Sequence, residues 1–417
     1  MAALRRCVLL VHPSRPRERT YPLGLAYLAA AAKRAGALVL GCDLRIDPPA
    51  KLVELLRQHP FDYVGITALS TTLSEAAFIV QQVRRIQPAS FVVVGGPHAT
   101  LAPRQTLQAT RADAIVRGDG ETPFAALLNG SLDVPGVTLR GQTPDDHVSV
   151  EPHLDRLPFA DRSVFPLEAY YRRGVFGSSR RTNLIVTRGC PLSCGYCNAN
   201  ALSRGTFRLR SIEQVMQEVQ RLRRDYHVDT LVLEDDNIGL DRDYALRLWR
   251  AFSEQNPRFR IDLPNGYHPA LVDEELIDAM AAAGVRSIAF GIESLDENHR
   301  ILLHRHFDLD RFLPIVAYAQ RKNIVTTGYI LIGIDGQSAR QAIQSASSLR
   351  TLPFDMVHVS VLLDLPNQGQ VVPSRTWKTV RAIMYVRIHL TPRRILRLMR
   401  LAAGSSRTDF DKPNRWC

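Results

Sequence analysis

The chain has 417 residues, of which 45% are hydrophobic and 23% are charged, and this composition excludes a disordered, collagen-like or fibrous protein. At about 150 residues per domain, the length predicts two or three domains. Six cysteines are too few for a disulfide-rich secreted scaffold, whereas three of them within eight residues indicate a metal or redox centre in a reducing compartment. No apolar run reaches the ~18 residues of a transmembrane helix, and the apolar N-terminal stretch is too short for a signal peptide. We therefore expect a cytoplasmic protein.

The formal net charge of +12 is concentrated at the C-terminus. Residues 371–417 hold eleven Lys and Arg against Asp409 and Asp411, a net charge of +9, so the rest of the chain carries only +3. No recognition-helix, RNA-binding or zinc-finger pattern accompanies this basic segment, which argues against nucleic acid as a partner. Two interpretations stay open: a terminal segment docked by its apolar side, which we favour, and a basic segment on an anionic membrane surface. Pro392 is expected to divide the segment into two short helices.

Residues 1–130 alternate five short apolar runs with helical stretches, a pattern typical of a doubly wound, Rossmann-like α/β domain. The expected strands cover residues 7–11, 37–41, 63–67, 91–94 and 114–116, and the expected crossover helices cover 23–35, 74–86 and 101–110. The ligand crevice of such a sheet lies beyond the carboxyl ends of its strands. Small and polar residues gather at those ends, in His12-Pro13, Ser70-Thr71-Thr72, Gly95-Gly96-Pro97-His98 and Gly118-Asp119-Gly120-Glu121. Each cluster alone is also compatible with a structural turn.

A Pro-bearing stretch without clear periodicity, residues 131–178, is interpreted as a connector with a short hairpin. A second βα series follows, with strands expected at residues 183–187, 230–233, 260–263, 287–290, 326–331 and 356–362. These six units indicate a partial (β/α)6 barrel of the TIM type over residues 179–370, with functional groups at the carboxyl ends of its strands. Residues 371–417 are expected to form a small, mostly helical C-terminal region that covers the open side of the barrel.

Three cysteines directly follow the first expected barrel strand. Cys190, Cys194 and Cys197 have the spacing C-x3-C-x2-C, and Gly189, Pro191 and Gly195 make the segment a loop. Three thiolates on one loop can hold three irons of a cubane cluster and leave the fourth iron open to a substrate or cofactor. The alternatives are a zinc site, which would need His268 or a distant cysteine as its fourth ligand, and cysteines that are merely buried.

The segment TRGCPLSCGYCNAN resembles the cluster loop of the radical S-adenosylmethionine (SAM) superfamily, with Tyr196 as the aromatic residue before the third cysteine. The resemblance implies a [4Fe-4S] cluster on the three cysteines and SAM at its open iron. The later segments LVLEDDNIGLD, FGIES and GYILIGIDGQS resemble strand ends that contact SAM in this family. The implied SAM-binding residues are Tyr196, Asp235, Asp236, Asn237, Glu293 and Gly333. Without the resemblance, Asp235 and Asp236 would equally suit a helix N-cap, and Glu293 an ion pair.

The N-terminal domain resembles the cobalamin-binding domain that precedes the barrel in one class of radical SAM enzymes. The segments VLLVHP, ITALSTT, VVVGGPHAT and VRGDGET carry this resemblance. The Asp-x-His-x-x-Gly segment that supplies an axial histidine in other cobalamin proteins is absent here, as it is in this class, so His98 is interpreted as a bystander. The implied cobalamin-binding residues are Pro13, Ser70, Thr71, Gly95, Gly96, Pro97, Gly118, Gly120 and Glu121.

The two resemblances together imply a cobalamin-dependent radical SAM C-methyltransferase, in which a 5′-deoxyadenosyl radical activates an unactivated carbon and methylcobalamin supplies the methyl group. The implied partners are a small-molecule or natural-product substrate and an external electron donor of the flavodoxin or ferredoxin type. The alternatives are a cyclase, ring-rearranging or oxidising enzyme with the same cofactors, and a cobalamin-binding regulatory module. The sequence names no catalytic residue and no substrate, although it places Asn265, Tyr267 and His268 at the barrel mouth.

Overall fold

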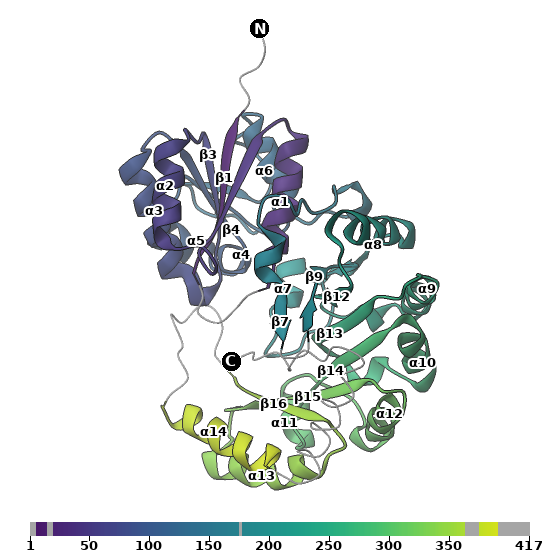
Figure 1. The fold of residues 1–417 in the computed structure, drawn as a ribbon. Helices are drawn as coiled ribbons and strands as arrows, with labels where there is room; N and C mark the ends of the chain where they lie inside the picture. Colours follow the sequence, from purple (N-terminus) through teal and green to yellow (C-terminus); the bar gives the residue numbers. More distant parts are fainter. Residues whose placement is uncertain (1–5, 15–19, 175–176, 363–374, 391–417) are drawn as a thin grey trace.

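The computed structural model describes residues 6–14, 20–174, 177–362 and 375–390, which form two α/β units joined side by side (Figure 1). The first unit is a six-stranded sheet in the order β2-β1-β3-β4-β5-β6. Its strands are β1 (Cys7–His12), β2 (Leu38–Asp43), β3 (Tyr63–Thr67), β4 (Phe91–Gly95), β5 (Ala114–Val116) and β6 (Val137–Leu139). The five expected strands are confirmed and run parallel, whereas β6 comes from the expected connector and pairs antiparallel with β5.

Alternate residues of these strands face two different cores, because successive side chains of a strand point to opposite faces of the sheet. Leu9 and Val11 pack with α2 (Pro49–Gln58) and α3 (Leu73–Ile86), whereas Val8 and Leu10 pack with α1 (Leu23–Arg34) and α6 (Glu121–Leu128). The helix expected at 101–110 is in fact two helices, α4 (Pro97–Leu101) and α5 (Pro103–Thr110). Pro103 causes the break, since a residue that precedes proline is disfavoured in the helical conformation.

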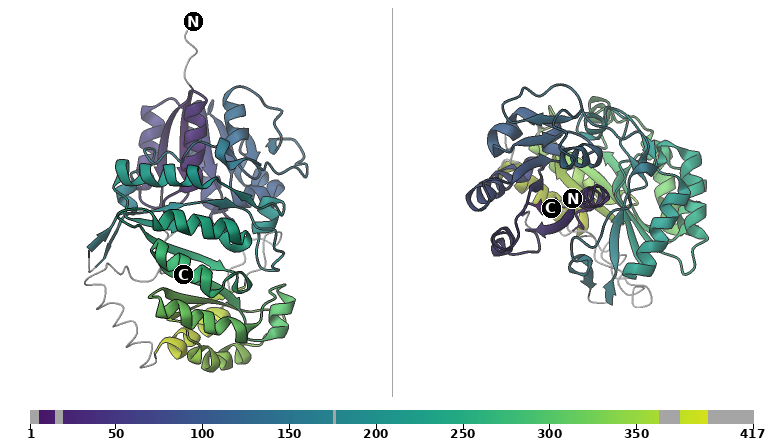
Figure 2. Two further views of the ribbon diagram at one scale, coloured as in Figure 1. Left: turned by 90° about the vertical axis from the view of Figure 1, so that its right-hand side faces the viewer. Right: turned by 90° about the horizontal axis from the view of Figure 1, so that it is seen from above.

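The second unit is a six-stranded, fully parallel sheet in the order β16-β15-β14-β13-β12-β9, so all six expected strands are confirmed. They are β9 (Arg181–Leu184), β12 (Thr230–Leu233), β13 (Arg260–Tyr267), β14 (Val285–Glu293), β15 (Val325–Ile332) and β16 (Met356–Val361). The helices α8 (Ile212–Tyr226), α9 (Arg242–Ser253), α10 (Glu274–Ala283), α12 (Leu309–Arg321) and α13 (Ala339–Thr351) lie along its outer face (Figure 2). Because β9 and β16 both have a free edge in this order, the barrel is partial, as expected.

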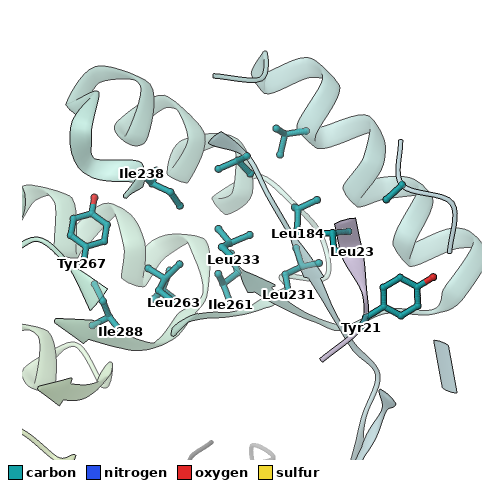
Figure 3. Close-up of a cluster of buried hydrophobic side chains, with 14 of the residues drawn as sticks. Tyr21, Leu23, Leu184, Leu231, Leu233, Ile238, Ile261, Leu263, Tyr267 and Ile288 are labelled. Atoms are coloured by element: carbon teal, nitrogen blue, oxygen red, sulfur yellow. The ribbon is translucent and has the colours of Figure 1, made fainter. Parts of the chain in front are cut away.

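The two units share one hydrophobic core (Figure 3). Tyr21 and Leu23 of the first unit lie in the same buried cluster as Leu184 and Leu231 of the second. The face of the first sheet that carries α1 is therefore the face that meets the second unit.

The expected hairpin of the connector is the antiparallel pair β7 (Arg172–Gly174) and β8 (Gly177–Ser179).

The helix α14 (Arg375–His389) covers the edge strand β16. The backbone N–H of Val359 donates to Tyr385 Oη at 3.1 Å, and that of Val357 donates to His389 Nε2 at 3.3 Å. An uncovered edge strand would expose such groups to pairing with another chain. The expected docking of the C-terminal region is thus confirmed for α14, while Pro392 and the arginines that follow it lie outside the described residues. Within the described part of the chain, no helix is long and apolar enough to cross a membrane.

Candidate cofactor site

The three cysteines lie on the loop that follows β10 (Thr187–Arg188), a short strand paired with β11 (Arg208–Leu209). Gly189 opens this loop with a φ of +86°, and a Cβ atom at this position would lie 2.3 Å from the carbonyl oxygen of Thr206. Only glycine satisfies both the left-handed backbone and this close approach. Cys190 and Cys194 are buried and Cys197 is exposed, so the loop spans from the protein interior to its surface.

Two N–H groups already point at cysteine sulfurs. Arg305 Nη1 lies 3.6 Å from Cys194 Sγ, and the backbone N–H of Ala199 lies 3.5 Å from Cys197 Sγ. Such bonds stabilise thiolates in iron–sulfur sites and tune their potential. Burial raises the pKa of Cys190 to about 11. Metal coordination would be needed to remove this proton at neutral pH.

The donor set fits a cubane cluster better than a single ion. Within the described residues, no three His, Cys, Asp or Glu side chains converge closely enough to hold one metal ion. In a cubane cluster each cysteine binds a different iron. The cysteine sulfurs therefore lie farther apart than the ligands of a single zinc ion. His268, the suggested fourth zinc ligand, instead accepts a hydrogen bond from Ala270 N at 3.1 Å and packs against Phe307. The geometry gives the zinc alternative no support.

Asp235 fastens the start of the cysteine loop from the end of β12. Its Oδ1 accepts hydrogen bonds from the backbone N–H groups of Val186 and Thr187 and from the Thr187 hydroxyl. Burial raises the pKa of Asp235 to about 7 despite these bonds. Its Oδ2 is buried without a partner among the described residues. One carboxylate oxygen of Asp235, an expected SAM-binding residue, is therefore taken by hydrogen bonds within the protein. Only the other oxygen remains for a bound molecule.

The next two expected SAM residues differ in exposure. Asp236 is exposed, and its Oδ2 accepts a hydrogen bond from Gly189 N at 3.1 Å, next to the first cysteine. Asn237 is buried, and its Oδ1 has no partner within the described part of the chain. A buried, unpaired amide oxygen is costly unless a ligand or water meets it. Both positions thus suit a polar ligand near the loop.

The end of β14 meets the cysteine loop directly. The Tyr196 hydroxyl donates to Glu293 Oε1 at 2.6 Å, and Glu293 has a φ of +63°, which is unusual for a residue with a side chain. Burial raises the pKa of Glu293, although the nearby Arg305 and the Tyr196 hydroxyl lower it. Two residues that the sequence predicts as SAM ligands are therefore paired with each other. Gly333, the last of that set, follows β15 with a φ of +79°, and a Cβ atom added there would lie 3.4 Å from the Trp377 side chain of α14.

A cavity of about 580 Å³ lies between the two units. Six of the nine expected cobalamin residues line it, namely Gly95, Gly96, Pro97, Gly118, Gly120 and Glu121. From the second unit it is lined by Thr187, Arg188, Gly189 and Asp236, among others. The carboxyl ends of the first sheet and the start of the cysteine loop therefore border one space.

The four expected cobalamin-binding glycines that line this cavity are glycine for different reasons. Gly96 and Gly118 have φ values of +95° and +83°, and an added Cβ would collide with Thr67 Oγ1 at 2.7 Å or with Ser149 O at 2.0 Å. Their absence of a side chain is thus required by the fold. Gly95 and Gly120 have no such requirement, since the nearest atoms to an added Cβ lie at 3.7 and 3.6 Å. The small size of these two leaves room in the cavity for a large ligand, which fits a cobalamin site.

The remaining three cobalamin candidates do not line the cavity. The Ser70 hydroxyl shares a 2.9 Å hydrogen bond with His98 Nδ1, so His98 orients the Ser70 side chain. His98 is buried, and its Nε2 has no partner among the described residues. Pro13 is buried beside His12, and Thr71 is exposed. Their expected contacts to cobalamin stay predictions.

Ion pairs join the two loops at this cavity. Arg188 Nη1 lies 2.9 Å from Asp119 Oδ1, and Arg188 Nη2 lies 2.6 Å from Glu121 Oε1. Arg208 also pairs with Asp119 and donates to the carbonyl oxygen of Glu151. Glu121, an expected cobalamin residue, is therefore already paired with a residue of the second unit.

Comparison with known proteins decides the family. Residues 15–128 match the B12 binding domain, and residues 184–349 match the radical SAM superfamily. The chain therefore combines a B12 binding domain with a radical SAM domain. Its fold is similar to that of the radical S-adenosylmethionine methyltransferase TsrM from Kitasatospora setae, solved with cobalamin and a [4Fe-4S] cluster bound, with a TM-score of 0.75 and 21% identity over 87% of this chain and 76% of that one.

Two curated relatives of this radical SAM protein carry different activities. Cytidylyl-2-hydroxyethylphosphonate methyltransferase from Streptomyces wedmorensis is 27% identical in an alignment that covers 78% of this chain and 72% of the relative. Anaerobic magnesium-protoporphyrin IX monomethyl ester cyclase from Rubrivivax gelatinosus is 22% identical in an alignment that covers 83% of this chain and 64% of the relative. The relatives therefore include a cyclase as well as a methyltransferase.

Sequence reasoning missed three polar residues of this radical SAM protein. Arg188 lies in the motif TRGCPLSCGYCNAN and Asp119 in the motif VRGDGET, but neither motif predicts a role for them. Their pairing is visible only in the fold. Arg305, which reaches Cys194 and donates to the Gly291 carbonyl oxygen, belongs to no motif. No local signal marks an arginine that acts across the fold.

Proposed function

We propose that this chain is a cobalamin-dependent radical SAM C-methyltransferase that acts on a small-molecule or natural-product substrate. The observation that supports this most is the shared cavity, which Gly95 and Gly120 border from the cobalamin domain and Gly189 and Asp236 border from the radical SAM domain. A methyl transfer of this kind requires both cofactors near one substrate carbon, because reacting groups must be held in a near-attack geometry.

The proposed roles follow from position. Cys190, Cys194 and Cys197 hold the cluster, with Arg305 donating to Cys194. Tyr196, Asp236, Asn237, Glu293 and Gly333 orient SAM, while Asp235 chiefly positions the loop through Thr187. When bound, the cluster and SAM supply a 5′-deoxyadenosyl radical and cobalamin supplies a methyl group. The chain itself contributes binding, orientation and the exclusion of water.

We further propose an external electron donor of the flavodoxin or ferredoxin type and a cytoplasmic location. The cysteine loop reaches the surface at Pro191, Ser193, Gly195 and Cys197, which offers a donor a short path to the cluster. Thiols that must stay reduced for a cluster suit a reducing compartment.

The test uses the anaerobically reconstituted protein with reductant, cobalamin and SAM that carries a labelled methyl group. We expect 5′-deoxyadenosine above the level of a Cys194→Ala control and, with the true substrate from cell extract, label in the product. A wild-type protein that forms no more 5′-deoxyadenosine than the control would refute the radical step.

The cyclase relative supports a second candidate, a cyclising or oxidising enzyme with the same cofactors. The same assay separates the two activities. Consumption of a substrate with formation of 5′-deoxyadenosine and no label in the product would favour the second candidate. Bound cobalamin without any 5′-deoxyadenosine would instead indicate a regulatory module.

A further inference from the structure

One guanidinium group connects the loop that borders the cobalamin cavity to the loop that carries the cysteines. Arg188 is the last residue of β10, two positions before Cys190. Its two terminal nitrogens are divided between Asp119 at 2.9 Å and Glu121 at 2.6 Å, which both belong to the Gly118–Glu121 turn of the first unit. A change in the position of the Asp119 or Glu121 carboxylate would therefore shift Arg188 and the backbone that leads into the cysteine loop.

The surroundings hold this guanidinium in place. Arg188 stacks on the Tyr27 ring of α1, with 4.9 Å between its Cζ and the ring centroid. Arg208 lies directly opposite Arg188 in the β10–β11 pair and reaches the same Asp119. Burial opposes the ionisation of Asp119, but the two arginines overcome it, and the net pKa of Asp119 lies below its usual range. Two positive and two negative groups thus neutralise each other in a mostly buried position.

Both ends of this connection lie beside a glycine in close surroundings. Gly118 has a φ of +83° and packs against Ser149, and Gly189 has a φ of +86° and packs against Thr206. The Asp119 carboxylate also accepts from Glu151 N at 2.9 Å. Arg188 therefore joins two turns that are each held by their own neighbours.

The shared hydrophobic core holds the two units together as bodies, and the Arg188 ion pairs act at the cavity, between one loop of each unit. We propose that Arg188 is a positioning residue which, through Asp119 and Glu121, fixes the cobalamin-binding turn relative to the cysteine loop and so sets the separation of the two cofactors. This inference rests on the proposed function for its meaning, but the coupling of the two loops is a property of the protein alone.

The first experiment measures hydrogen exchange in the full chain without cofactors. We compare the wild type with Arg188→Gln, Arg188→Lys and the control Arg242→Gln, which removes an arginine that also binds two carboxylates, Asp273 and Glu275, but at the exposed surface. Arg188→Gln is expected to speed exchange several-fold both in residues 117–121 and in residues 187–190. Arg188→Lys should restore part of the protection, since it keeps the charge without the two-pronged geometry, and the control should change neither segment.

Faster exchange confined to residues 187–190, or no change in either segment, would overturn the proposal. If Arg188→Gln does not fold, Glu121→Gln makes the same test from the other domain and should loosen residues 187–190, in which nothing was changed. Because no cofactor is present, this result is independent of whether the protein later forms 5′-deoxyadenosine.

The second experiment uses the loaded protein and electron paramagnetic resonance. A reduced cluster speeds the relaxation of a nearby cob(II)alamin signal in a way that depends steeply on their separation. We expect this effect in the wild type and in Arg242→Gln, and a loss or broad distribution of it in Arg188→Gln at equal cofactor content. An unchanged effect in Arg188→Gln would refute the claim that Arg188 sets the separation of the cofactors.

Discussion

The Tyr196 hydroxyl and the Glu293 carboxylate are joined by a 2.6 Å hydrogen bond, although 97 residues separate them in the sequence. Tyr196 belongs to the cysteine loop, and Glu293 ends β14, which lies three strands away from β9 in the sheet. Burial raises the pKa of Glu293, so each donor to its carboxylate matters. The pair therefore ties the proposed cluster loop to a residue that is expected to contact SAM.

Replacing Tyr196 by Phe should weaken SAM binding. The change removes the hydroxyl donor from a buried carboxylate, which leaves that group less stable as an anion and less able to orient a ligand. At about 1–2 kcal/mol for such a bond, we expect the Kd for SAM to rise roughly tenfold. Equilibrium binding to the reconstituted protein measures this. Tyr318→Phe is the control, because Tyr318 bonds the Asp278 carboxylate at 2.9 Å far from the loop, and an equal effect of both variants would contradict the prediction.

Two glycines of the cavity wall should respond differently to alanine. Gly95→Ala adds a methyl group in ordinary contact with its neighbours, at 3.7 Å from Val116 O, so the fold should tolerate it. The methyl group takes space from the cavity, and we expect cobalamin affinity to fall tenfold or more. Gly118→Ala meets Ser149 O at 2.0 Å and a φ of +83°, so it should lower the free energy of unfolding by more than the ~1–2 kcal/mol of backbone strain alone. Urea unfolding and cobalamin titration of both variants measure these effects, and unchanged cobalamin affinity in Gly95→Ala would contradict the proposed site.

Asp235 should make the protein less stable as the pH rises. Burial raises its pKa from 3.8 to about 7 in the folded state, so the folded chain binds a proton that the unfolded chain releases between about pH 4 and 7. Its contribution to stability is complete below pH 4 and is lost as the pH rises through 7. Asp235→Asn removes this titration and keeps an oxygen acceptor for Thr187. The difference in unfolding free energy between the two proteins should therefore change across pH 4–7 in favour of the variant and then level off, and a difference that is constant with pH would refute the assignment.

The fold was predictable because its signals are local. Most parallel strands of the two sheets contain a short apolar run, which is recognisable without a distant partner because such strands are covered on both faces. The strand β9, with the sequence RTNL, is an exception. The spacing of Cys190, Cys194 and Cys197 is equally local, and so is the glycine pattern at the ends of β4 and β5. The helices α2 and α6 and the strand β6 have no counterpart among the predicted elements. The strand β6 could not be recognised because three residues without an alternating pattern are stabilised only by pairing with β5.

The hydrogen bonds and ion pairs of the site were not predictable, because they depend on which side chains the fold brings together. Arg188 and Glu121 are 67 residues apart, and Arg305 and Cys194 are 111 apart. Asp235 illustrates the same limit: the sequence placed it correctly at a strand end, but only the fold shows that its Oδ1 is taken by Val186 and Thr187. The sequence motifs thus mark the candidate site, while the fold shows which of their side chains are already paired within the protein.

The helix α14 should be an integral part of the barrel rather than a removable tail. Met384 is fully buried, and Val386, two positions later, is 56% exposed on the same helix. Met384→Ala should lower the free energy of unfolding by about 2–5 kcal/mol, because it removes buried atoms and leaves a cavity, whereas Val386→Ala should have little effect. Urea unfolding of the two variants measures the difference. Truncation after Gln370 goes further, since it removes Tyr385 and His389 from the N–H groups of β16, and should give an unstable or aggregating protein. A truncated chain with full stability would show that α14 does not close the edge of this sheet.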